Sequence, residues 1–246
     1  MKLKEQVSDT ELKLMLNNKQ VLENKDSLKS DFRSLFQIDE DAQYMSVWYL
    51  ETPAQGLRKD GWSVRYRQKE ESHAELTIKK RYEEKDYRAM LDTKYADILS
   101  CDFKPEIDMT YTKKTFSLSY ERVFSDDVKI DEAEAKRLAI INSPAAFTNY
   151  KNKNFGFNQL CASKLLGPVK ASTYKGKFED YEAKLEIWKL KDYLCEISFD
   201  IPSKKSTDLK RDMLKLLAKN DLLLTIDILK TDAMLDYYAK KNEQQN

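Results

Sequence analysis

The run from residue 49 to 81, YLETPAQGLRKDGWSVRYRQKEESHAELTIKKR, most constrains the fold, because charged and apolar residues alternate along much of it with a period of two. This period is typical of β-strands, whose successive side chains point to opposite faces of a sheet. Arg65 and Arg67 therefore share one face of a predicted strand, while Val64 and Tyr66 share the other. The run predicts a strand, a turn and two further strands, with a basic face and an apolar face.

The last strand of this run, residues 75–81, repeats the pattern, with Lys79 and Arg81 on one face and Leu76 and Ile78 on the other. The basic side chains that the run brings together are Arg58, Arg65, Arg67, Lys79 and Arg81. Paired guanidinium groups are well suited to hold phosphate oxygens, so the pattern predicts a polyanion site. The alternative is an ordinary solvent-facing sheet whose arginines pair with acidic strands.

An acidic strand is predicted near the start of the chain, in VSDTELKLML. Asp9, Glu11 and Lys13 alternate there with largely apolar residues, so they share one face. Carboxylates two residues apart on a strand can share a hard divalent cation, which binds oxygen ligands and bridges to substrate phosphates. A solvated edge strand is the alternative interpretation of this pattern.

Three motifs in this order resemble the CYTH or triphosphate tunnel metalloenzyme family: the acidic-x-acidic-x-Lys strand, YLETP followed by GLRKDGWSVRYR, and ELTIKKR. The resemblance covers residues 5–82 and returns over 165–200, in GPVKASTYKGKF, YEAKLEIW and YLCEISFD. The family includes inorganic, thiamine and RNA triphosphatases and class IV adenylate cyclases. The resemblance implies an α+β fold, a closed antiparallel β-barrel that forms a polar tunnel, with helices packed outside. It also implies a single domain over 1–246, with a family-atypical insertion at about 83–160.

The resemblance implies roles for individual residues. Glu11 and Lys13 would be catalytic, and Asp9, Glu11 and Glu196 would hold Mg²⁺ or Mn²⁺. The residues expected to bind substrate phosphates are Lys13, Arg65, Arg67, Lys79, Arg81, Lys175 and Lys177.

Two features of the later strands depart from the family pattern. Ser198 replaces the second carboxylate of a Glu-x-Glu pair that begins at Glu196. Asp200 is on the same face but would be displaced by roughly 6–7 Å along the strand. Glu186 occupies the place of a further strand carboxylate. Lysines 175 and 177 stand where the family more often has arginine.

Composition excludes several classes of protein. The 43 basic and 42 acidic residues leave a net charge of +1, which gives no general reason to bind nucleic acid, so any anion site must be local. The scattered Cys101, Cys161 and Cys195 predict no disulfide framework, and the single histidine, His73, excludes a histidine-based zinc site. Because no apolar stretch approaches ~20 residues and no signal-like segment begins the chain, we expect a cytoplasmic protein with no membrane partner.

The remaining elements follow from spacing. We expect helices over 26–36, 86–99, 131–141, 207–219 and 232–241, a strand over 45–50, a polar loop over 148–159, and a β-hairpin over 106–124. Glu106 and Asp108 alternate in that hairpin like the acidic pair of the first strand. We expect the hairpin to stand outside the barrel, so the two residues are left out of the predicted site.

These inferences predict metal-dependent hydrolysis of a small-molecule triphosphate or polyphosphate. Phosphoryl transfer depends mainly on positioning and electrostatic stabilisation, so no protein nucleophile is required. Two alternatives stay open. One is a binding protein that holds a polyphosphate or nucleotide without turnover, which Ser198 favours; the other is a class IV adenylate cyclase.

Overall fold

The computed structural model of the chain describes residues 9–24, 27–69, 73–82, 103–124, 128–151 and 154–243. Its strands follow one another in the hydrogen-bonded order β1-β5-β6-β4-β3-β2-β7-β8-β9, which closes a barrel. The strands are β1 Asp9–Leu16, β2 Gln43–Glu51, β3 Trp62–Lys69, β4 Ala74–Tyr82, β5 Lys104–Met109, β6 Lys114–Val123, β7 Lys164–Phe178, β8 Tyr181–Lys189 and β9 Tyr193–Pro202. The predicted α+β fold with a closed β-barrel is confirmed.

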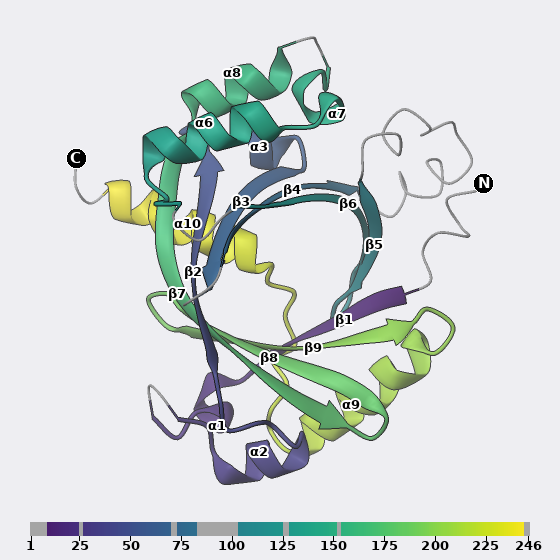
Figure 1. Cartoon of the computed structure of the whole chain (residues 1–246). Helices are drawn as coiled ribbons and strands as arrows, with labels where there is room; N and C mark the ends of the chain where they lie inside the picture. Colours follow the sequence, from purple (N-terminus) through teal and green to yellow (C-terminus); the bar gives the residue numbers. More distant parts are fainter. Residues whose placement is uncertain are drawn as a thin grey trace. The chain divides into compact units, whose positions relative to one another are not determined.

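The helices are mostly short. They are α1 Asn18–Val21, α2 Ser30–Leu35, α3 Gly56–Lys59, α6 Glu132–Asn142, α7 Ala145–Thr148, α8 Phe155–Ala162, α9 Ser206–Lys219 and α10 Lys230–Glu243 (Figure 1).

The chain forms two compact units: residues 46–106 with 115–168, and residues 5–45 with 107–114 and 169–246. The single-domain organisation stays a prediction. None of the helices that the structure describes is long and apolar enough to cross a membrane.

Two predictions about strand pairing are wrong. The barrel is mixed rather than antiparallel throughout, because β1 pairs in parallel with β5, where Glu11 aligns with Asp108. No tight turn joins these two strands, so chain connectivity does not impose the antiparallel direction. The predicted hairpin forms as β5 and β6, but it belongs to the barrel instead of standing outside it. The reason is that β6 pairs with β4 along the full run from Glu75 to Tyr82.

In the first unit, β3, β4 and β6 form a sheet with one apolar face. Val64, Tyr66, Leu76 and Ile78 on that face are fully buried. The Tyr66 hydroxyl donates to a backbone carbonyl of α6 at 2.7 Å, so this helix covers the apolar face. The helix starts after an N-cap at Asp131, and the helix predicted over 131–141 is confirmed. The opposite face of the sheet is left for polar side chains.

The prediction of a polar loop over 148–159 is wrong for its second half, because α8 begins at Phe155. Phe155, Gly156 and Leu160 are buried on one side of the helix, and Phe155 packs edge-on against Phe147 at 6.2 Å between ring centroids. The asparagines of this segment gave it a polar composition, so the apolar face of α8 was not predicted. The helix expected over 86–99 lies outside the described residues.

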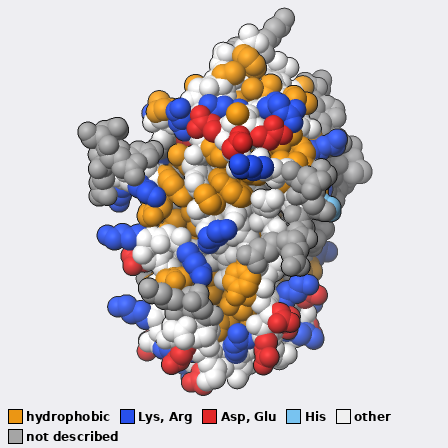
Figure 2. All heavy atoms as spheres, turned by 60° about the vertical axis from the view of Figure 1, so that its left-hand side comes forward, with side chains coloured by type: hydrophobic (Ala, Val, Ile, Leu, Met, Phe, Trp, Pro, Cys, Tyr) orange, Lys and Arg blue, Asp and Glu red, His pale blue; other side chains and the backbone are white. Residues whose placement is uncertain are grey.

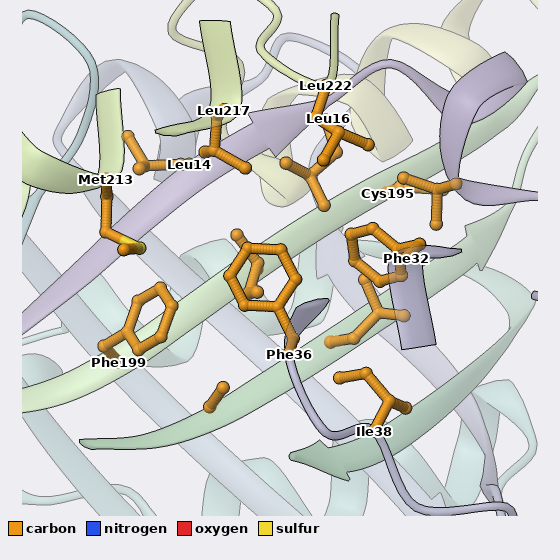
Figure 3. Packing of buried hydrophobic residues seen from close by; sticks show 14 of the residues in the cluster. Leu14, Leu16, Phe32, Phe36, Ile38, Cys195, Phe199, Met213, Leu217 and Leu222 are labelled. Carbon is orange, nitrogen blue, oxygen red and sulfur yellow. The ribbon is translucent and has the colours of Figure 1, made fainter. Parts of the chain in front are cut away.

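In the second unit, the apolar face of β1, β9, β8 and β7 packs against α1, α2 and α9. Phe36 and Phe199 lie in this core, together with Met213 and Leu217 of α9 (Figure 3). Burying such a side chain fully stabilises the fold by about 1.5–3 kcal/mol. The helices predicted over 207–219 and 232–241 are confirmed as α9 and α10, whereas α2 is shorter than the predicted 26–36. Core packing on this face places Glu11 and Lys13 of β1, and Glu196 of β9, on the other face.

Candidate functional site

The arginines of β3 lie on the polar face of the first unit. Arg65 is opposite Thr77 and Arg67 is opposite Glu75 in the register of β3 and β4. The Nη2 atom of Arg65 donates to the Thr77 hydroxyl at 3.0 Å. The Glu75 carboxylate lies 3.8 Å from Arg65 and 4.0 Å from Arg67, and the two arginine side chains are only 22% and 17% exposed. The predicted basic face therefore exists, and one carboxylate partly balances it.

Two of the three basic residues of β4 lie on the same face. Lys79 donates to the Glu106 carboxylate of β5 at 2.6 Å, and the Nη1 atom of Arg81 donates to the Ser63 hydroxyl at 3.4 Å. Glu106 thus contacts a predicted site residue, although sequence reasoning left it out. The alternation of EIDMTY was the signal that could have included it.

The YLETP turn holds the backbone of Arg58 through a buried carboxylate. Glu51 accepts hydrogen bonds from the backbone N–H groups of Thr52, Leu57 and Arg58, at 2.7, 3.1 and 2.9 Å. Burial raises the pKa of the Glu51 carboxyl, and these N–H donors counteract part of the rise. The acid therefore caps the first turn of α3 and fixes the position from which Arg58 projects.

The acidic strand of the second unit centres on Lys13. Its ammonium lies 2.7 Å from the Glu11 carboxylate and 2.8 Å from that of Asp108 on β5. Burial opposes the charge of Lys13, but Asp108 and Glu11 raise the lysine pKa above its ordinary value. Burial also disfavours the charge of Glu11, yet Lys13 lowers the pKa of that carboxyl. Lys13 and Glu11 are therefore charged at neutral pH, and Asp108 joins the predicted pair.

A second acidic pair lies on β8 and β9 of the same unit. Glu186 and Glu196 are opposite one another and only 2% and 4% exposed. The ammonium of Lys230, at the start of α10, lies 2.6 Å from Glu186 and 2.5 Å from Glu196. Burial opposes the charge of Lys230, but the two carboxylates raise its pKa. Sequence reasoning missed Lys230, because no local pattern links the start of a distant helix to these strands.

The remaining residues named from the sequence lie on β1, β7 and β9. Lys175 and Lys177 are exposed on β7, opposite Lys184 and Glu182. The side chain of Asp9 lies outside the described part of the structure. Ser198 is buried opposite Lys13, whereas Asp200 is exposed opposite Glu11.

The carboxylates meet only some of the requirements of a divalent-cation site. Among the described residues, no three Asp, Glu, His or Cys side chains gather closely enough to hold one by themselves. Glu11 and Asp108 nevertheless offer oxygen donors from aligned positions, which suits a hard cation that keeps several of its waters. Each acidic pair also contacts a lysine ammonium, Lys13 in one case and Lys230 in the other, so a cation would have to compete with that lysine.

The histidine and the two described cysteines lie on the surface or in the core. His73 is exposed, as is Cys161. Burial raises the pKa of the Cys195 thiol to about 12, so this residue remains an uncharged core side chain. On the face drawn in Figure 2, Lys and Arg side chains are interspersed with Asp and Glu. This face therefore mixes both signs of charge, in keeping with the near-neutral composition.

Comparison with solved structures identifies the fold. HpAC1 of Hippeastrum, a proposed adenylyl cyclase with a dominant triphosphatase activity, superposes with a TM-score of 0.59 at 12% identity, over 93% of this chain and 95% of the other. A proposed adenylate cyclase of Bacillus halodurans has a TM-score of 0.55 at 15% identity, over 92% and 97% of the two chains. No protein-family model and no curated protein matches the sequence. The resemblance to tunnel proteins of the CYTH type is confirmed at the level of the fold.

Proposed function

We propose that the protein hydrolyses a small triphosphate, inorganic or organic, with the help of Mg²⁺ or Mn²⁺. The observation that carries the proposal is the basic face of the first unit, where Arg65 and Arg67 of β3 and Arg81 of β4 share one side of the sheet. Guanidinium groups on neighbouring strands fit the oxygens of a phosphate chain. The fold, shared with a protein of dominant triphosphatase activity, supports the same reaction class.

The basic residues and the acidic residues have different proposed roles. Arg65 and Arg67 would grip phosphate oxygens in place of Glu75, their present partner. Lys13 would hold Glu11 and Asp108 in place, because its ammonium contacts both carboxylates. When bound at these two acids, the cation would neutralise charge that develops on the phosphate oxygens.

A panel of triphosphates tests the proposal. Purified protein is incubated with tripolyphosphate, thiamine triphosphate or ATP, with Mg²⁺, with Mn²⁺ or with EDTA, and the products are measured. We expect orthophosphate to be released from at least one substrate and only with metal. Release that continues in EDTA would contradict the metal requirement, and pyrophosphate with cyclic AMP would instead identify a cyclase.

A second candidate is binding without turnover, and one contact favours it. Lys230 already neutralises Glu186 and Glu196, and Ser198 adds no carboxylate beside them. This candidate predicts tight tripolyphosphate binding by calorimetry, with no orthophosphate released from any substrate of the panel. Orthophosphate release at multiple turnovers would exclude it.

A further inference from the structure

Two donors on the polar face of β4 and β6 are not used by the arginine cluster. Ser117 is fully buried, and within the described parts of the chain its hydroxyl has no hydrogen-bond partner. It lies directly opposite Arg81, whose Nε atom is also buried without a partner there. Opposed residues have Cβ atoms ~4.5–5.5 Å apart, so both donors can reach a single ligand.

The chemistry of these donors defines the ligand. A guanidinium can only donate hydrogen bonds, and a serine hydroxyl can donate one as well. A buried donor without an acceptor destabilises the protein, so both groups gain from a ligand that supplies oxygen acceptors. The Nη1 atom of Arg81 also donates to the Ser63 hydroxyl on β3, which helps to orient the guanidinium. Ser63 is itself buried on the same polar face.

Arg81 differs from the other basic residues of this face in its surroundings. Glu75 lies within 4.0 Å of Arg65 and of Arg67, and Glu106 lies 2.6 Å from Lys79. For Arg81, no carboxylate of a described residue lies within ion-pair distance. An anion that approaches Arg65 must compete with Glu75, whereas an anion that approaches Arg81 meets no such competitor.

We propose that Arg81, Ser117 and Ser63 form a separate anion subsite, which anchors a phosphoryl group more strongly than Arg65 and Arg67 do. Its ligand is an oxyanion with several free oxygens, such as a terminal group of a phosphate chain. This inference rests on the anion-binding part of the proposed function and not on hydrolysis. It names Ser117 as a specificity residue that no charge pattern in the sequence indicates.

Calorimetric titration with inorganic pyrophosphate, without divalent metal, tests the subsite. Arg81→Gln should weaken binding by about 10- to 100-fold and Ser117→Ala by about 2- to 10-fold, the ranges for charged and neutral hydrogen bonds. Arg65→Gln should weaken binding less than Arg81→Gln does. Arg122→Gln is the matched control, because Arg122 is exposed on the opposite face of the same strand pair. It should bind pyrophosphate like the wild type.

Thermal unfolding without ligand separates binding from structural roles. Ser117→Ala removes a buried hydroxyl that has no described partner, so its melting temperature should equal or exceed that of the wild type. A clear fall would make Ser117 structural and overturn the proposal. Unchanged pyrophosphate affinity in both Arg81→Gln and Ser117→Ala, or a larger loss in Arg65→Gln, would also overturn it.

The two proposals fail in different ways. Weakened pyrophosphate binding in Arg81→Gln, together with no orthophosphate release by the wild type, would contradict the proposed hydrolysis and support the proposed subsite. Hydrolysis by a wild type whose pyrophosphate affinity is insensitive to Arg81 would remove the subsite and leave the hydrolase. A wild type that does not bind pyrophosphate at all would overturn the subsite.

Discussion

At the scale of single residues, Lys13 shows how one side chain sets the charge of its neighbours. Its ammonium contacts Glu11 from its own strand and Asp108 from another. Attraction between opposite charges keeps Lys13 and Glu11 ionised, although burial acts against the charge of both. The alternation of β1 predicted that Glu11 and Lys13 share a face, but Asp108 enters only through pairing with a distant strand.

Glu11→Gln tests the acidic cluster at the residue scale. The amide keeps the size of the side chain but removes the anionic oxygens that a hard cation prefers, so metal-dependent orthophosphate release should be lost. Circular dichroism and tripolyphosphate binding should stay close to those of the wild type. Glu182→Gln, at an exposed position of β8, is the control and should keep its activity. Normal turnover of Glu11→Gln at low Mg²⁺ would remove Glu11 from the site.

At the scale of elements, side chains from outside the barrel strands hold the second unit together. Lys230 reaches from α10 to two strands, and Asp227 accepts hydrogen bonds from the backbone N–H and the hydroxyl of Thr112 in the turn after β5. Both contacts join segments more than 30 residues apart. A sequence pattern predicts each element but not these side-chain contacts, because the contacts depend on which elements become neighbours in the fold.

Lys230→Gln should destabilise the protein by about 3–5 kcal/mol, because it removes the ammonium that bridges the buried carboxylates of Glu186 and Glu196, which face each other. Lys240→Gln, at an exposed position of the same helix, should change stability by less than about 0.5 kcal/mol. Urea unfolding of the three proteins at pH 7 measures both values. Equal stability of the two variants would mean that the contacts of Lys230 contribute little.

Asp227 gives an expectation for pH. Burial disfavours its charge, but hydrogen bonds from Thr110 and Thr112 outweigh this effect and lower the pKa of the carboxyl in the folded protein. A carboxyl with a lowered folded pKa stabilises the protein above its unfolded pKa of about 3.9 and loses that contribution as pH falls through the folded value. The stability difference between wild type and Asp227→Asn should therefore shrink between pH 6 and pH 3. A constant difference in urea titrations would contradict this.

At the scale of the whole molecule, the sequence predicted most elements and the closed barrel but not its complete connectivity. Alternation placed Arg65, Arg67 and Glu11 on polar faces, because burial of the alternate residues dictates that choice. The parallel pairing of β1 with β5, and with it the place of Asp108, depends on contacts about 100 residues apart. Local pattern carries no information about such contacts. The helix at Phe155 was missed for a different reason, since few apolar residues suffice to anchor a short helix.

Phe36→Ala tests whether the molecule unfolds as a whole. The side chain is fully buried in the second unit, so its truncation should cost about 3–5 kcal/mol. Strand β7 contributes residues to both units, 164–168 to the first and 169–178 to the second, and this continuity favours one cooperative transition. Unfolding followed by circular dichroism and by tryptophan fluorescence should shift together. A variant whose first unit melts at the wild-type temperature would show that the units unfold independently.

The lysine-bridged carboxylates have a consequence for how the chain acquires its structure in a cell. Glu11 with Asp108, and Glu186 with Glu196, have covalently attached counter-ions in Lys13 and Lys230. Some small metal-binding domains fold only when their metal is bound, and chelators denature them. Maturation of this chain should instead be independent of metal supply. Its melting temperature should be the same in EDTA as in Mg²⁺-free buffer, and newly made protein should reach the folded state during metal starvation.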